Sequence, residues 1–131
     1  MEYIDNCDDL FELSKKERLK ELQNLKEMAT VCKKSDGFGI IIEVHSEDHG
    51  ILGDKTNPAH AHIKTIDDEY LGKFAITLEP PRTTDYIFDC DKNIQIPIQY
   101  KKSIVEWANK KNKDEVSGWT TLKIVWRALH P

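Results

Sequence analysis

The sequence predicts an α+β domain with an N-terminal helix, a small antiparallel sheet of about four to five strands, and two C-terminal helices packed on that sheet. Two observations lead to this fold class. Runs of strand length that are rich in β-branched residues fill the middle of the chain, and apolar residues recur every three or four positions near both ends. A chain of 131 residues has the usual length of one domain with one hydrophobic core. We therefore expect a single domain over 1–131, with a helical N-terminal extension at 1–36 and an α+β core at 37–131.

Residues 8–34 are predicted to form one long helix or a pair of helices. Apolar side chains recur there at helical spacing among many lysines and glutamates, at Leu19, Leu22, Ala29 and Cys32. Ser14 and Glu17 match the S-x-x-E capping box, in which each side chain bonds a backbone N–H near the helix start. The Ser-Asp-Gly run at 35–37 is typical of a helix stop followed by a turn. The main helix is therefore expected to run from about Ser14 to this turn.

The middle of the chain is predicted to form antiparallel strands. In GIIIEVHS, alternate side chains share a face, so that Glu43 and His45 point away from Ile40, Ile42 and Val44. Gly, Asn, Asp and Pro residues mark the connections between the strands. The five predicted strands are 39–46, 59–65, 71–79, 86–90 and 93–98.

Two helices are predicted after Tyr100, where the apolar period changes from two to about 3.6 residues. Their apolar faces consist of Ile104, Trp107 and Ala108 in the first helix, and of Trp119, Leu122, Val125, Trp126 and Leu129 in the second. All three tryptophans lie in this part of the chain. Their helical spacing favours core anchors that hold the helices on the sheet over platforms that stack nucleic-acid bases.

Charge is distributed unevenly along the chain. The net charge is -4, but residues 100–131 carry seven basic and three acidic side chains, so that the first 99 residues carry a charge of -8. The basic end predicts contact with an anionic partner such as nucleic acid, through Lys101, Lys102, Lys110 and Lys111. The alternative, which the acidic pI of about 5.7 favours, is that these lysines only solvate helix surfaces.

The sequence predicts neither a membrane protein nor a disulfide-rich one. The longest apolar runs are too short to span a bilayer, and the acidic start MEYIDNCDDL lacks the pattern of a signal peptide. Cys7, Cys32 and Cys90 are odd in number, lie far apart and form no C-x-x-C pair. We expect a cytoplasmic protein without membrane contact, whose thiols are reduced and mostly structural.

The histidines form the one cluster with recognisable chemistry. Four of the five histidines fall within 18 residues, together with the acidic residues Glu43, Glu47, Asp48 and Asp54. His60 and His62 share one face of a predicted strand, and pairing with the preceding strand would bring His45 or His49 near them. Two or three imidazoles plus a carboxylate suit a divalent transition metal such as zinc. The predicted metal ligands are His45, His49, His60 and His62.

Such a site would activate water or polarise a phosphate. Without a metal, a histidine beside an aspartate would serve as a general base. The alternative is structural, namely an H-x-H pair that holds the loop by hydrogen bonds or contacts a partner. The sequence contains no G-x-S-x-G, P-loop or H-E-x-x-H motif. A cupin pattern also fails, because Gly53 lies one residue too far from His60 and no second histidine motif follows.

The motifs SEDH, NPAHAHI, GKFAITLEP and SIVEWANKKNKDEVSGW, within about 37–126, resemble those of domain of unknown function family 4160. These small bacterial proteins typically show a D-H-N-P-P-H-x-H signature. By this resemblance, the signature positions are Asp48, His49, Asn57, Pro58, His60 and His62. The chain departs from the family pattern by an insertion at 50–56, by Ala59 in place of the second proline, and by the additional N-terminal helix.

The resemblance implies a member of a gene pair of the toxin-antitoxin kind, with no established activity. We therefore expect a non-enzymatic protein-binding or regulatory component of a bacterial or phage-borne module, toxin-antitoxin-like or an inhibitor of a host enzyme. An acidic helix that mimics nucleic acid, with Asp8, Asp9 and Glu12 at the contact, would fit such an inhibitor. The alternatives are a metal-dependent hydrolase or nuclease built on the histidine cluster, and a nucleic-acid-binding protein that uses the C-terminal lysines.

Overall fold

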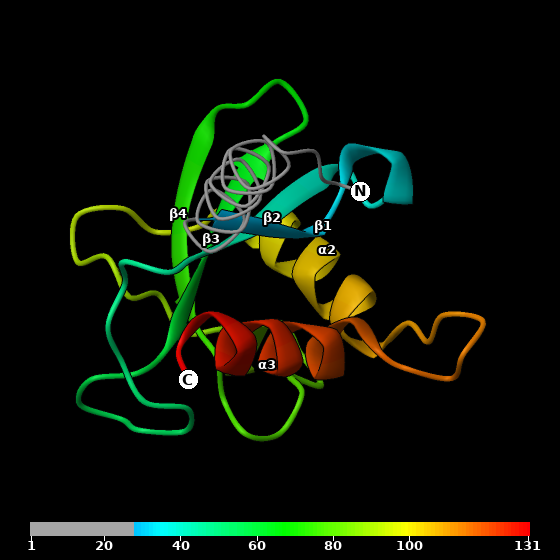
Figure 1. The fold of residues 1–131 in the computed structure, drawn as a ribbon. Coiled ribbons are helices and arrows are strands. Elements are labelled where there is room, and N and C mark those ends of the chain that lie inside the picture. Colours follow the sequence, from blue (N-terminus) through cyan, green and yellow to red (C-terminus); the bar gives the residue numbers. More distant parts are fainter. Residues whose placement is uncertain (1–27) are drawn as a thin grey trace, which may run out of the picture.

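The computed structural model describes residues 28–131, whose centre is an antiparallel sheet of four strands (Figure 1). The strands are β1 (Met28–Cys32), β2 (Ile40–His45), β3 (His60–Thr65) and β4 (Tyr70–Ala75). Each strand pairs with the next along the chain, so that the sheet order is β1-β2-β3-β4. Two helices, α2 (Ile98–Asn109) and α3 (Gly118–Leu129), follow the sheet, and the predicted α+β class is confirmed. Among the described helices, none is long and apolar enough to cross a lipid bilayer.

The two faces of the sheet differ in polarity. On one face, side chains from β2, β3 and β4 are fully buried and form the core with residues of both helices; they are Ile40, Ile42, Val44, Ala61, Ile63 and Phe74. On the other face, Glu43 of β2 lies opposite His62 of β3. Because side chains alternate along a strand, His45, His60 and Lys64 share this polar face. The alternation predicted for the strands at 39–46 and 59–65 therefore holds in β2 and β3.

The tryptophans anchor the helices to the apolar face of the sheet. Trp107, Trp119 and Trp126 are at most 4% exposed. The Trp119 indole N–H donates a 2.9 Å hydrogen bond to the Thr77 carbonyl, and its ring stacks on Phe74 with centroids 5.9 Å apart. These contacts satisfy the one polar atom of a buried indole, as expected for a core anchor.

The helix predicted over 1–36 is contradicted at its end, and residues 1–27 lie outside the described part of the chain. Met28–Cys32 is strand β1, and Lys34–Asp36 is a short 3-10 turn. Ala29 lies opposite Val44, and a register shift between Thr30 and Cys32 marks a bulge. The extra residue of a bulge moves Cys32 onto the face of Ala29, where the thiol is fully buried. A spacing of three residues, which resembles a helix face, therefore arises from an irregular strand.

The two strands predicted at 86–90 and 93–98 do not form. The first segment contacts β4 only through one isolated bridge, in which the Ala75 N–H donates to the Phe88 carbonyl and the Cys90 N–H donates to the Lys73 carbonyl. The Asp89 carboxylate accepts a 2.9 Å hydrogen bond from the Ile96 N–H. This side-chain contact occupies a backbone donor that a strand would use for pairing, and the segment continues to α2 as a loop.

Candidate functional site

A turn after β2 brings Asp48 back against the polar face of the sheet. The Asp48 N–H donates a 3.3 Å hydrogen bond to the His45 carbonyl, which reverses the chain directly after the strand. One carboxylate oxygen of Asp48, Oδ2, then lies 2.7 Å from His62 Nε2 and 3.3 Å from His60 Nε2. We call His45, Asp48, His60 and His62 the Asp48 cluster.

The side chains of the Asp48 cluster converge on a small volume. The ring centroids of His45 and His62 are 4.2 Å apart, and those of His60 and His62 are 5.6 Å apart. One potential ligand atom from each of His45, Asp48 and His62 lies within 4.8 Å of the other two. Sheet register explains this arrangement, because His62 lies opposite Glu43 and His45 is the diagonal neighbour on the same face. The structure therefore brings together three of the four histidines that the sequence predicted as ligands.

His49 is the predicted ligand that the structure leaves outside the cluster. Its side chain is exposed and makes no hydrogen bond or ion pair with residues 28–131. The insertion that follows is closed on itself, because the Ile51 N–H donates to the Asn57 carbonyl and the Ala59 N–H donates to the Ile51 carbonyl. With the loop closed in this way, Asp48 lies beside His60, whereas His49 stays outside the cluster.

The ring of His60 has one nitrogen free of hydrogen bonds. Its Nδ1 donates to the Pro58 carbonyl over 3.4 Å, so that the neutral ring has a lone pair on Nε2. His60 Nε2 is buried and has no hydrogen-bond partner among the described residues. The contact of 3.3 Å with Asp48 Oδ2 is within ion-pair distance but lacks hydrogen-bond geometry. Two electron-rich atoms thus face each other, an arrangement that a proton, a water or a cation would relieve.

The protonation states of Asp48 and His62 suit a metal ion. Burial acts to raise the pKa of the Asp48 carboxyl, but the hydrogen bond with His62 and the nearby imidazoles outweigh it, so that this pKa lies below its ordinary value of 3.8. Burial lowers the pKa of His62 below its ordinary value of 6.5, although Asp48 opposes the shift. Both shifts favour a carboxylate beside a neutral imidazole, and these are the forms that bind metal.

Glu43 lies on the same strand as His45, β2, and contacts the His45 ring. Glu43 as a whole residue is 6% exposed. Its Oε1 lies 3.4 Å from His45 Nε2 and 3.2 Å from Lys64 Nζ. Lys64 balances the buried negative charge of Glu43. When His45 Nε2 donates to Glu43, Nδ1 is free to bind an ion, as in the carboxylate–histidine pairs that orient metal ligands.

No known protein family matches this sequence, and no curated protein and no solved structure is significantly similar to it. The resemblance to family 4160 therefore stays a prediction that rests on the short motifs.

The other predicted site residues lie apart from the Asp48 cluster. Asp8, Asp9 and Glu12, the predicted partner contacts, are outside the described residues. Among the lysines predicted to bind nucleic acid, Lys101 forms a 2.8 Å ion pair with Asp89, and Lys111 lies 3.9 Å from Glu115. Lys102 and Lys110 are exposed. Two of these four lysines thus have acidic partners within the chain.

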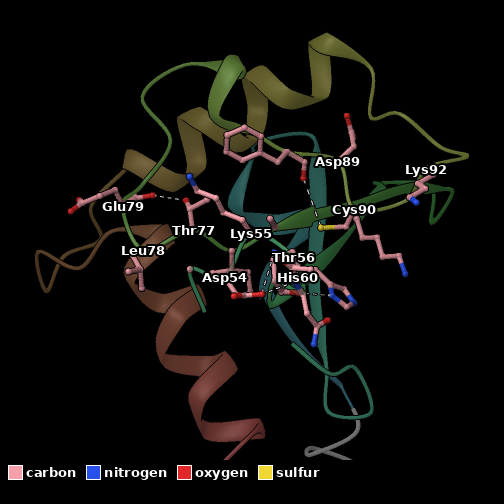
Figure 2. Close-up of a pocket in the computed structure, with 17 residues that line it drawn as sticks. Asp54, Lys55, Thr56, His60, Thr77, Leu78, Glu79, Asp89, Cys90 and Lys92 are labelled. Atoms are coloured by element: carbon pink, nitrogen blue, oxygen red, sulfur yellow. Dashed lines mark hydrogen bonds between the residues drawn. The ribbon is translucent and has the colours of Figure 1, made fainter. Parts of the chain in front are cut away.

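A cleft of about 980 Å³ lies beside the Asp48 cluster, and His60 belongs to both (Figure 2). Its walls come from three segments: the loop after β2, the end of β4 with the residues that follow, and the segment before α2. Figure 2 shows side chains from each wall, among them Lys55, Leu78 and Cys90. This volume is in the range of sites that bind small organic molecules. An ion held by the cluster would therefore lie at the edge of a cleft with room for a substrate.

Proposed function

We propose that this protein is a metal-dependent hydrolase in which His45, Asp48 and His62 bind one divalent transition metal ion, with zinc as the first candidate. The observation that carries the proposal is the approach of two imidazoles and one carboxylate to within 4.8 Å of one another. We prefer this function to partner binding because the Asp48 cluster supports it, whereas the partner contacts predicted from the sequence lie outside residues 28–131.

The interatomic distances suit such an ion. Zinc binds imidazole nitrogens and carboxylate oxygens at about 2.0 to 2.2 Å, so that two ligand atoms of a tetrahedral site lie roughly 3.3 to 3.6 Å apart. His62 Nε2 and Asp48 Oδ2 are 2.7 Å apart, as in a hydrogen bond, and the wider limit for the three ligands is 4.8 Å. Side-chain movements of about 1 Å would convert this arrangement into a tetrahedral ligand set.

The ligand set and its surroundings support hydrolysis. Three protein ligands leave a fourth position open, which is typical of catalytic rather than structural zinc. An ion bound there supplies Lewis acidity that lowers the pKa of a water molecule to about 7. His60 lies beside the ligands, and its buried Nε2, which has no hydrogen-bond partner among the described residues, would accept the proton of that water. The His60 side chain also lines the adjoining cleft, so that a substrate bound there would lie beside it.

Metal titration of the metal-free, untagged protein tests the ligand assignment. We expect about one equivalent of zinc to bind the wild type, and Asp48→Asn and His62→Gln to weaken binding by at least about 10- to 100-fold. His49→Gln is the matched control, because His49 lies in the same chain segment but outside the cluster, and it should bind zinc like the wild type. Zinc binding below about a tenth of an equivalent in the wild type, or equal affinity in Asp48→Asn, would contradict the proposal.

His60→Gln separates metal binding from catalysis. We expect this variant to keep its zinc affinity but to hydrolyse a panel of 4-nitrophenyl esters about 10²- to 10⁴-fold more slowly, because the proton acceptor is lost. A variant that loses zinc and activity together would make His60 a fourth ligand, and one with unchanged activity would remove it from the mechanism.

The two other functions considered from the sequence stay predictions. A protein-binding or inhibitory role would use Asp8, Asp9 and Glu12, and a pull-down from the native host with these residues mutated tests it. The nucleic-acid function is weakened by the ion pair of Lys101 with Asp89, which removes one predicted cation from phosphate binding.

A further inference from the structure

We infer that the cleft beside His60 binds an organic phosphate, and that the substrate of the proposed hydrolase is a phosphate ester. The inference rests on the proposed function and adds the substrate class to it. Three features of the cleft carry it: lysines without an acidic partner, apolar side chains exposed to the cleft, and a lysine placed by the sheet register beside the metal ligands.

The charged groups of the cleft favour an anion. Lys55, Lys73 and Lys92 line it, and none of them forms an ion pair with another described residue. Of the three acidic residues in the same walls, Asp54 and Asp89 are already engaged, whereas the Glu79 carboxylate has no partner among residues 28–131. Asp54 accepts hydrogen bonds from the backbone N–H groups of Thr56 and Asn57. Asp89 accepts from the Ile96 N–H and pairs with Lys101. The cations of the cleft therefore remain available to a ligand, whereas most of its carboxylates do not.

Lys73 lies on the strand that adjoins the metal ligands. In the pairing of β3 with β4, Lys73 is directly opposite His62, and His60 is opposite Ala75. Directly opposed side chains on one face of a sheet start about 5 Å apart, so that Lys73 extends from the same face as His62. A phosphate held by Lys73 would thus adjoin both the ion and His60, the two groups that the proposed reaction needs.

Apolar side chains line another part of the cleft. Leu78 is 56% exposed and Phe88 is 49% exposed, and both side chains line the cleft. A Cβ at Gly53 would lie 2.6 Å from Leu78, so that the glycine lets the loop after β2 pack directly on this side chain. These groups would contact the organic part of an ester, while the lysines bind its phosphate.

The reaction is an ordinary hydrolysis and needs no further reactant. A bond forms between the water oxygen and phosphorus, and the bond between phosphorus and the ester oxygen breaks. The water proton passes to His60 Nε2 and then to the departing oxygen, so that an alcohol or phenol and inorganic phosphate are the products.

Phenyl phosphate is a suitable probe, and calorimetry on the metal-free protein measures the cleft independently of the ion. We expect a Kd below about 1 mM for the wild type. Lys73→Gln should weaken binding at least about tenfold, as expected for loss of a charge-assisted contact. Lys55→Gln serves as a second variant on an exposed loop, and Lys102→Gln, outside the cleft, is the control that should bind like the wild type. Phe88→Ser should weaken binding of phenyl phosphate but not of inorganic phosphate.

The outcomes separate the two proposals. If zinc binds as expected but phenyl phosphate shows no binding up to about 10 mM, or binds equally to Lys73→Gln and Lys55→Gln, the phosphate-ester inference is wrong and the metal centre stands. If phenyl phosphate binds with the expected losses but zinc does not bind, the proposed hydrolase fails and the cleft remains an organic-phosphate site.

Discussion

Cys32 is a buried thiol whose ionisation opposes folding at alkaline pH. It is fully buried, and its Sγ–H donates to the Ile40 carbonyl over 3.7 Å. Burial, with a smaller contribution from the charge of Asp36, raises the pKa of Cys32 from 9.0 to about 12. Between these values the unfolded chain loses the thiol proton while the folded chain keeps it. The stability that Cys32 contributes is therefore complete below pH 9 and is lost as the pH rises towards 12.

Urea unfolding of the wild type and of Cys32→Ala between pH 8 and pH 11 tests this expectation. At pH 8 the variant should be less stable because a buried side chain is truncated. Above pH 9 the wild type should lose up to about 1.4 kcal/mol more per pH unit than the variant, so that the two free energies of unfolding approach each other. If the free energies of unfolding of the two proteins changed in parallel with pH, Cys32 would ionise equally in the folded and the unfolded chain.

For Asp48 and His49, the sequence could not predict which side chain faces the sheet. Both are adjacent polar residues of one loop, and both fit the signature of the resembling family. Only the turn closed by the Asp48 N–H and the His45 carbonyl decides which of them faces the sheet. Strand periodicity predicted the shared face of His60 and His62 correctly, because alternation is a local property. The position of a loop residue depends on backbone hydrogen bonds that the sequence pattern does not reveal.

At the scale of secondary structure, elements with a regular pattern of burial were predicted well. In β3 buried residues alternate with more exposed ones, and β2 does the same except at the buried Glu43. Helices α2 and α3 each bury one face that includes tryptophan. Each of these patterns spans a whole element and agrees with the local conformational preference of its residues.

Elements whose pattern is interrupted were predicted wrongly. The bulge in β1 places Ala29 and Cys32 on one face, and this spacing is also that of a helix. In the segment before α2, alternating apolar residues indicated strands, but the hydrogen bond from the Ile96 N–H to Asp89 draws the chain away from the sheet. In both cases a single side-chain hydrogen bond, or an irregularity of one residue, overrides the local preference.

On the scale of the whole molecule, the apolar face of the sheet carries the hydrophobic core, and the polar face carries the residues of the proposed metal site. The helices bury the apolar face, and the polar face carries charged and imidazole side chains, among them His60, whose ring centroid lies 6.2 Å from that of Trp126. The ligands of the proposed ion come from β2, from the loop after it and from β3. A bound ion would therefore link the loop after β2 to two paired strands of the sheet and would stabilise the folded state.

Thermal unfolding measures how much a bound ion stabilises the folded state. An ion that binds only the folded chain stabilises it by about 2.7 kcal/mol at a free concentration of 100 times Kd. For a domain of this size, that gain corresponds to a rise in Tm of roughly 10 °C. We expect the rise with zinc in the wild type and in His49→Gln, its reversal by a chelator, and its absence in Asp48→Asn. An equal rise in Asp48→Asn would place the ion elsewhere on the molecule. A rise that vanishes only in this variant would show that an ion on the polar face stabilises a fold whose core lies on the opposite face.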